Sequence, residues 1–325
     1  MASGRKILFV APSYGATGWY RCNVPGGELA RRGHLCHLDV GLEPSAILEH
    51  DVLVFSNPCN EAAEKAMQQA KLADRRVVVD FDDDPWHMTE AIPGAQPWDE
   101  QERSFVESCL SRADVVTTTN TFLAEFLTRF NERVLVLPNC LPAEWWNVKR
   151  EPHAETVIGW LGGPTHGPDL ELIAEPLNRV LSERPEVEFR LTVFEDNPFE
   201  PKRQVKIIPV TYDLADYSGL FAGIDIGLAP LVDNHFNKCK SDLKVLEYGG
   251  AGVPCIASKI VTYGRIVKQG ENGFLAGGAG EWVEYLERLV DDEDLRRRMG
   301  AEARRMAESR FIERNIELWE RAYGL

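Results

Sequence analysis

The part of the sequence best suited to bind a phosphorylated ligand is a helix start flanked by lysines. Ser241 is a good N-cap residue, and the pattern after it predicts a short helix. Lys244 and Glu247 then share one helix face, and Lys240 lies just before the helix. Free N–H groups at a helix start bind anions, and a carboxylate can accept hydrogen bonds from paired sugar hydroxyls. We therefore expect a diphosphate and a ribose to bind this element. A solvated helix face with an ion pair is the alternative.

A glycine loop precedes this helix in the chain and could approach the same ligand. Gly162 and Gly163 follow a strand-like segment in IGWLGGPTH, residues 158–166. Glycines in that position let backbone amides come close to phosphate groups, although an ordinary tight turn has the same pattern. His166 ends the loop, where it either caps the backbone or contacts the ligand.

Three residues in the first half of the chain are candidates for the opposite wall of a cleft. Tyr20 and Arg21 follow a glycine-rich loop, and we expect them to face the cleft, although a packed tyrosine beside a surface arginine has the same pattern. Asp82 lies in an acidic run, residues 80–84, at a strand end, and is the best candidate for a functional carboxylate. A solvated loop is the alternative for Asp83 and Asp84.

Apolar strand-like segments alternate with helical patterns along nearly the whole chain, which predicts an α/β fold with parallel sheets. In the first half the strands are expected at 6–10, 34–40, 51–55, 76–81, 114–119 and 133–138. In the second half they are expected at 156–162, 188–194, 206–210, 224–231 and 254–258, and helices at 281–290, 295–309 and 313–323 follow.

The alternation stops at a stretch rich in proline and tryptophan, Pro138 to Pro152, which predicts a boundary between two lobes. We expect a first Rossmann-like lobe over residues 1–148 and a second over 149–310. A C-terminal helix, 311–325, is expected to pack back on the first lobe.

The composition narrows the class of protein. The formal charge is −15, which disfavours a broad binder of nucleic acid or anionic lipid. The seven cysteines include no Cys-x-x-Cys pair, which favours reduced thiols and a cytoplasmic location. The apolar run that begins at Ile7 is too short for a signal peptide or a membrane span.

These motifs together resemble the retaining glycosyltransferases of the GT-B fold, in which two Rossmann-like lobes with parallel sheets face each other across a cleft. Glu247 matches the second of the family's paired glutamates, which contacts the nucleotide ribose. The first glutamate would fall at Cys239, so that half of the motif is missing. The resemblance therefore implies a variant branch in which Asn237, Lys240, Ser241 and Lys244 face the donor together with Glu247.

The resemblance also covers landmarks outside this helix. The segment 158–166 resembles the glycine loop of the donor lobe, 224–231 the strand that leads to the donor, and 271–276 the family's late Asn-Gly turn. In the first lobe, 113–120 and 134–139 match the strand ends before the interlobe linker.

The activity implied is transfer of a sugar, with retention, from a UDP- or GDP-linked donor to a hydroxyl acceptor. Asp82, His166 and Lys244 are the expected catalytic residues, and Tyr20, Arg21 and Asp82 the acceptor side. No cofactor and no metal are expected, because the lysines replace the ion of other transferases. Aspartates 80 to 84 do match an Asp-x-Asp metal motif, but in the sequence they lie in the first lobe, long before the lysine-flanked helix.

The acceptor stays open among a glycan, a protein, a small molecule and a modified nucleobase in DNA. A sugar-nucleotide epimerase of the same fold and a non-catalytic nucleotide-sugar-binding protein are the alternative functions. A metal-dependent transferase of the single-sheet type is a third, suggested only by the acidic run. Nothing in the sequence indicates the oligomeric state.

Overall fold

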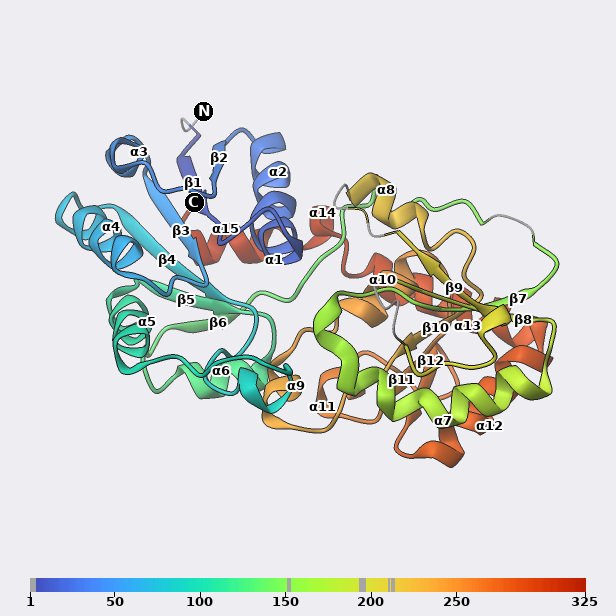
Figure 1. Ribbon diagram of the computed structural model, residues 1–325. Helices are drawn as coiled ribbons and strands as arrows, with labels where there is room; N and C mark the ends of the chain where they lie inside the picture. The colour runs from blue at the N-terminus through green and yellow to red at the C-terminus, as the bar shows by residue number, and fades with distance from the viewer. Residues whose placement is uncertain (1–3, 151–152, 193–196, 210, 212–213) are drawn as a thin grey trace.

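Two parallel sheets of six strands each form the centres of two lobes in the computed structural model (Figure 1), which describes residues 4–150, 153–192, 197–209, 211 and 214–325. The two-lobed α/β architecture predicted from the sequence is confirmed. Among the described residues, no helix has the length and apolar character needed to cross a bilayer.

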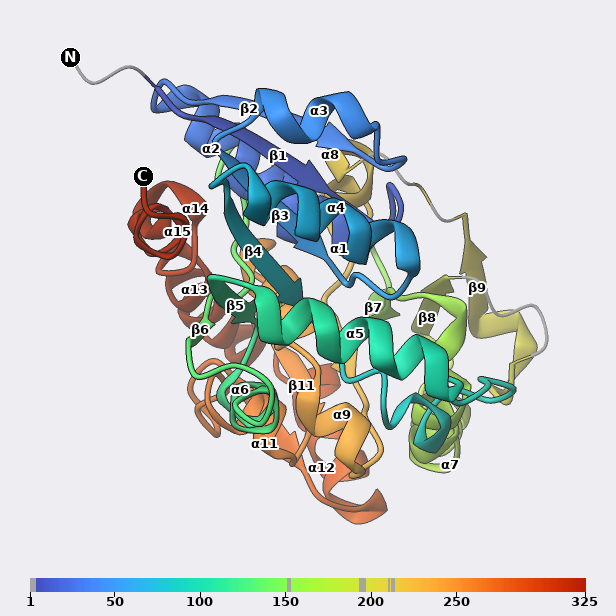
Figure 2. The same ribbon diagram turned by 90° about the vertical axis from the view of Figure 1, so that its left-hand side faces the viewer.

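The sheet of the N-terminal lobe has the strand order β2-β1-β3-β4-β5-β6. Its strands are β1 (Lys6–Val10), β2 (Leu35–Asp39), β3 (Val52–Ser56), β4 (Arg76–Phe81), β5 (Val115–Thr118) and β6 (Val134–Val136). The helices are α1 (Ala16–Gly18), a π-helical turn (Trp19–Asn23), α2 (Val24–Arg31), α3 (Pro44–Glu49), α4 (Glu61–Leu72), a 3-10 turn (Met88–Glu90), α5 (Glu100–Arg112) and α6 (Thr121–Leu127). Every residue of β3 is buried, because helices cover both faces of the sheet (Figure 2).

The sheet of the C-terminal lobe has the order β12-β11-β10-β7-β8-β9. Its strands are β7 (Thr156–Trp160), β8 (Val187–Thr192), β9 (Val205–Ile208), β10 (Ile226–Ala229), β11 (Cys255–Ser258) and β12 (Gly273–Ala276). The helices are a 3-10 turn (Pro164–His166), α7 (Gly167–Glu183), a 3-10 turn (Lys202–Gln204), α8 (Leu214–Gly219), α9 (His235–Cys239), α10 (Leu243–Gly250), α11 (Val261–Gly264), α12 (Ala279–Asp291) and α13 (Glu293–Glu308).

Each sheet has one point where the strand order reverses. It lies between β1 and β3 in the N-terminal lobe and between β7 and β10 in the C-terminal lobe. Open parallel sheets bind ligands outside the carboxyl ends of their strands at such a point. The loops that follow β1 and β7 are therefore the places where the fold itself favours a binding site.

The end of the chain returns to the N-terminal lobe through α14 (Ile312–Asn315) and α15 (Glu317–Tyr323) (Figure 1). The Tyr323 ring meets the edge of the Phe9 ring of β1, with 6.0 Å between centroids. Arg76 Nη2 donates to the Ala322 carbonyl oxygen over 2.9 Å. The chain passes between the lobes twice, once after β6 and once after α13. Leu141 in the first of these segments forms a parallel bridge with Phe311 in the second, so the two segments lie side by side.

The sequence and the structure differ at a few elements. The short helix predicted to follow Ser241 begins at Leu243, with Asp242 between them. The late Asn-Gly turn leads directly into a sixth strand, β12, which the sequence did not predict. The expected final helix is divided at Ile316 into α14 and α15.

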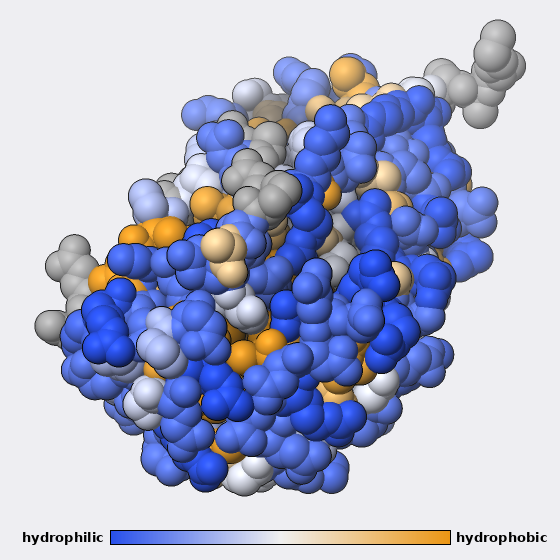
Figure 3. Space-filling view, turned by 90° about the vertical axis from the view of Figure 1, so that its right-hand side faces the viewer, coloured by the Kyte–Doolittle hydropathy of each residue, from blue (hydrophilic) through white to orange (hydrophobic). Residues whose placement is uncertain are grey.

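The surface at the C-terminal-lobe end of the molecule is mostly hydrophilic, with small and separate apolar areas (Figure 3).

Candidate functional site

A cavity of about 360 Å³ lies between the two lobes, at the carboxyl ends of the strands. The loops after β1 and β4 form its N-terminal wall, and the loop after β7, the α9–α10 region and part of α8 form the other. This volume lies at the lower end of the range for small-molecule sites. Most of the residues predicted from the sequence line it, namely Tyr20, Asp82, Gly162, Gly163, His166, Lys240, Ser241, Lys244 and Glu247.

Two lysine amines provide the positive charge of the cavity. Lys244 Nζ donates to the Leu161 carbonyl oxygen and lies 5.0 Å from the centre of the Trp160 ring. Burial lowers the pKa of Lys244, although Glu247 acts in the opposite direction. Lys240 Nζ lies 3.5 Å from a carboxylate oxygen of Asp83, across the gap between the lobes. Among the described residues, no carboxylate comes within 4.0 Å of the Lys244 amine, so an anionic ligand would compensate its charge.

Glu247 is only 4% exposed, and both of its carboxylate oxygens accept hydrogen bonds from tyrosines. Tyr20 of the N-terminal lobe donates to Oε1 over 2.7 Å, and Tyr217 donates to Oε2 over 3.2 Å. Burial raises the pKa of Glu247, while Lys244 and the two hydroxyls lower it. Each carboxylate oxygen keeps a second lone pair for a ligand hydroxyl.

Of the two glycines in the loop after β7, only Gly162 lies where a side chain would not fit. A Cβ at Gly162 would lie 2.5 Å from the Trp160 ring and 2.9 Å from Lys244 Nζ, so a side chain there would displace the cavity lysine. The Gly162 amide donates to Thr192 Oγ1 over 2.8 Å, which holds the loop at the end of β8. A Cβ at Gly163 would meet nothing within 4 Å, which leaves open space next to the backbone.

His166 lies at the end of this loop and is oriented by Asp169. The His166 Nδ1 atom is 2.7 Å from an Asp169 carboxylate oxygen, and burial lowers the pKa of the imidazole. Asn237, which we expected to face a ligand, is fully buried and does not line the cavity. Its amide nitrogen donates instead to an Asp169 carboxylate oxygen over 3.1 Å and to the Val232 carbonyl oxygen over 2.9 Å. Asn237 therefore supports His166 from behind.

Asp82 is a carboxylate of the N-terminal wall. Its two carboxylate oxygens accept hydrogen bonds from Thr17 Oγ1 and Asn57 Nδ2, both over 2.8 Å. Burial, followed by the charge of Asp83, raises its pKa to about 6. A carboxyl group with such a pKa exchanges protons efficiently near neutral pH.

Arg21 lies behind the cavity wall, which contradicts our expectation that it faces the cleft. Its side chain is 1% exposed and forms two hydrogen bonds with Asp80, of 2.8 and 2.6 Å. It also donates to the Leu137 carbonyl oxygen and to Asn139 Oδ1. A buried guanidinium needs this full set of acceptors, so the π-helical turn that carries Arg21 points it into the lobe.

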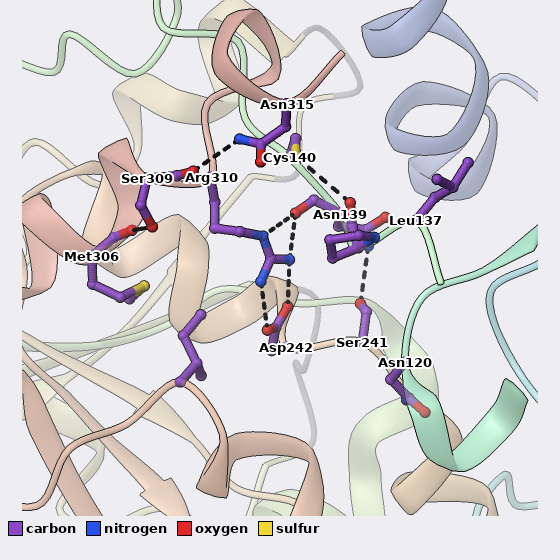
Figure 4. Close-up of polar contacts among 12 residues, drawn as sticks. Asn120, Leu137, Asn139, Cys140, Ser241, Asp242, Met306, Ser309, Arg310 and Asn315 are labelled. Carbon is purple, nitrogen blue, oxygen red and sulfur yellow. Dashed lines mark hydrogen bonds and ion pairs between the residues drawn. The ribbon is translucent and has the colours of Figure 1, made fainter. Parts of the chain in front are cut away.

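The start of α10 is fixed by a network across the lobes (Figure 4). Asn139 Nδ2 donates to Ser241 Oγ over 3.0 Å, and Arg310 bonds to both Asp242 and the Asn139 carbonyl oxygen. The predicted N-cap role of Ser241 is therefore wrong: Asp242 is the N-cap residue, and it forms no side-chain cap because Arg310 holds its carboxylate. The first amides of α10, like those of any helix, lack acceptors within the helix.

One segment of the chain matches a known family. Residues 243–306, which run from α10 to most of α13, match the model of glycosyl transferases group 1. The match begins with the helix that carries Lys244 and Glu247. No curated protein sequence matches the chain significantly.

Several solved structures share the arrangement of both lobes. HepE from Anabaena, solved in complex with UDP, is 15% identical with a TM-score of 0.70, over 98% of this chain and 100% of that one. Sucrose-phosphate synthase from Thermosynechococcus elongatus is 13% identical with a TM-score of 0.69, over 98% of each chain. The chain has the GT-B fold. A mutant of TarM from S. aureus, solved with fondaparinux, α-GlcNAc-glycerol and UDP, shares this fold at 12% identity, with a TM-score of 0.65. That match covers 84% of this chain but only 55% of TarM.

The GT-B fold and the matched domain support a glycosyltransferase. Sequence reasoning missed several residues of the site. Tyr217 reaches Glu247 from α8, and Thr192 and Thr17 hold the two loops. Only the position of Thr192 near the carboxyl end of an expected strand, 188–194, could have indicated its role, whereas no local pattern marks Tyr217 or Thr17.

The raised pKa of Asp82 can be measured directly by following its carboxyl ¹³C shift against pH. We expect a midpoint near pH 6, and Asp83→Asn should lower it because the neighbouring charge is removed. The folded pKa lies above the unfolded one, so ionisation of Asp82 costs folding free energy. Its contribution to stability is then largest below the ordinary aspartate pKa and is lost as the pH rises through about 6.

Asp74→Asn, which changes an exposed carboxylate far from the cavity, should leave the midpoint unchanged. A midpoint close to that of an ordinary aspartate in the parent protein would contradict the burial argument.

Proposed function

We propose that the chain transfers a sugar from a nucleoside diphosphate sugar to a hydroxyl acceptor in the interlobe cavity. The observation that carries the proposal is the enclosed Lys244 amine at the start of α10, close to the buried carboxylate of Glu247. A bound diphosphate would neutralise the positive charge of the Lys244 amine. The ribose hydroxyls would donate hydrogen bonds to the Glu247 carboxylate. The donor is UDP- or GDP-linked; UDP is favoured because HepE and TarM were solved with UDP.

The departing diphosphate gains negative charge in the transition state. Lys240, Lys244 and the first-turn amides of α10 are the groups that would stabilise it, and they do so without reorganisation because they are already held in place. The loop 162–166 would hold the phosphates and the sugar, with His166 oriented toward them by Asp169. Water must be kept out, since hydrolysis of the donor competes with transfer.

Asp82 would act on the acceptor side of the cavity. Its carboxyl group lines the N-terminal wall, and a pKa of about 6 suits proton exchange with an acceptor hydroxyl. Tyr20 lines the same wall and links it to Glu247. The acceptor class is a glycan, a protein, a small molecule or a modified nucleobase in DNA, with no metal and no cofactor taking part in the transfer.

A donor screen followed by an acceptor assay tests the function. Thermal shift with UDP, GDP, ADP and CMP sugars identifies the nucleotide, because a ligand that binds only the folded chain raises the melting temperature. The selected donor is then incubated with candidate acceptors, and free nucleotide and glycosylated product are measured. Acceptor-dependent release of nucleotide is expected. Release of a rearranged sugar without acceptor would indicate an epimerase, and binding without turnover a non-catalytic protein.

The donor helix gives the first quantitative prediction of this proposal. Lys244→Ala and Glu247→Ala should each weaken binding of the nucleotide sugar by about ten- to hundredfold, since each removes a charge-assisted contact of about 1.5–3 kcal/mol. Isothermal titration calorimetry on the folded variants measures the change. Lys238→Ala is the matched control, because Lys238 pairs with Asp233 and lies outside the cavity. Parental affinity in both cavity variants would sink the assignment.

The metal-free mechanism predicts that added Mg²⁺ or Mn²⁺ leaves donor affinity and transfer rate nearly unchanged, because the lysines already neutralise the diphosphate. Asp82→Asn should lower kcat far more than donor affinity, since its carboxylate faces the acceptor side. Transfer that requires manganese, together with loss of donor binding in Asp82→Asn, would instead make the acidic run a metal-dependent donor site.

Retention of the anomeric configuration is the stereochemical prediction, and it rests on the resemblance to the retaining glycosyltransferases. Proton NMR of freshly formed product, recorded before mutarotation, should show the same configuration as the donor. An inverted linkage would place the chain in another branch of the GT-B fold.

A further inference from the structure

A cluster of three metal-ligand side chains lies on the seam between the lobes, outside the cavity. Asp84 follows β4 of the N-terminal lobe, and His235 and Cys239 belong to α9 of the C-terminal lobe. Their donor atoms, an oxygen, a nitrogen and a sulfur, all lie within 4.8 Å of one another. Asp84 and Cys239 are fully buried, whereas the side chain of His235 is 34% exposed.

The separations of these atoms fit a tetrahedral ion. His235 Nε2 is 3.2 Å, and Cys239 Sγ 3.7 Å, from the same oxygen of Asp84. Bonds to zinc of about 2.0–2.3 Å, combined with the tetrahedral angle, place neighbouring ligand atoms about 3.3–3.6 Å apart. The two separations from Asp84 differ from these values by only a few tenths of an ångström, and the third pair, His235 Nε2 and Cys239 Sγ, lies within 4.8 Å.

Two further observations point to a ligand at this position. His235 Nε2 is a buried nitrogen that forms no hydrogen bond within the described ranges, because its 3.2 Å approach to Asp84 does not have hydrogen-bond geometry. His87 Nδ1 contacts the shared Asp84 oxygen at 2.6 Å, and the Trp86 amide donates to the other oxygen over 3.0 Å. Carboxylate ligands of metals are typically oriented by such outer hydrogen bonds.

We propose that Asp84, His235 and Cys239 form a zinc site that joins the two lobes, with a fourth position open to water. A thiolate and an imidazole favour zinc over magnesium or calcium, which prefer oxygen ligands. His235 and Cys239 are four residues apart on α9, so one helix face presents both. None of the three residues lines the interlobe cavity, so this site is separate from the one proposed for sugar transfer.

The site would also fix one edge of the cavity. Cys239 directly precedes Lys240, and Asp84 directly follows Asp83, the carboxylate that pairs with Lys240 across the lobes. A bound ion would therefore fix the residue next to each partner of the Asp83–Lys240 ion pair. Cys239 occupies the position where the resemblance places a glutamate, and here its side chain is directed to the seam and not to the cavity.

Metal titration of the full chain, without any nucleotide, tests the site. After removal of metal with a chelator, Zn²⁺ is titrated against a chromophoric competitor, and Co²⁺ binding is followed by visible absorption. The parent should bind one equivalent, with a thiolate-to-cobalt charge-transfer band. His235→Ala and Cys239→Ser should weaken binding by about a hundredfold or more, and His87→Ala by about ten- to hundredfold, the range for an outer-sphere partner. Cys36→Ser, at a half-buried cysteine of β2, is the control.

The band should disappear in Cys239→Ser and persist in Cys36→Ser. If Cys239→Ser does not fold, His235→Ala decides the question, because its partly exposed position tolerates truncation. A parent that binds neither ion, or a folded His235→Ala variant with parental affinity, would overturn the zinc site. Because the titration contains no nucleotide sugar, either result is independent of the proposed sugar transfer.

Discussion

The buried guanidinium of Arg21 ties the N-terminal sheet to the linker that leads to the second lobe. A charge that is 1% exposed needs acceptors on every side, and Arg21 finds them in Asp80 at the end of β4 and in the linker at Leu137 and Asn139. Asn139 in turn donates to Ser241 before α10. The first lobe, the linker and the helix that carries the cavity lysine are thus placed by one connected set of hydrogen bonds.

The parallel sheets turn this placement into a site. All loops that follow the strands lie at one edge of each sheet, and the two edges face each other. Residues with opposite functions are thereby brought together from distant parts of the chain. Tyr20 reaches Glu247 across the gap, and Asp83 reaches Lys240. The contacts between lobes thus use the same side chains that face the cavity, so ligand binding and lobe position depend on each other.

Local patterns predicted the strands and most of the cavity lining, because alternating apolar segments and glycine loops are short-range signals. Most of the failures involve partners far away in the chain. The N-cap residue of α10 is Asp242 and not Ser241, and Arg310, which is distant in the sequence, binds its carboxylate. Arg21 turns into the lobe because Asp80 offers an acceptor there. Asn237 is buried because Asp169 offers an acceptor. The strand β12 was missed because its four residues were interpreted as part of an Asn-Gly turn.

The return of α15 to the N-terminal lobe couples the folding of the two lobes during synthesis. Phe9 belongs to β1, which leaves the ribosome before the rest of both lobes, but its ring packs against Tyr323, which is made only after the C-terminal sheet. The first sheet must therefore wait with part of its core uncovered while the second lobe is completed. Contacts between such distant segments slow folding and expose apolar surface in the meantime. Nascent chains of this protein should accordingly depend on chaperones until residues 312–323 have emerged.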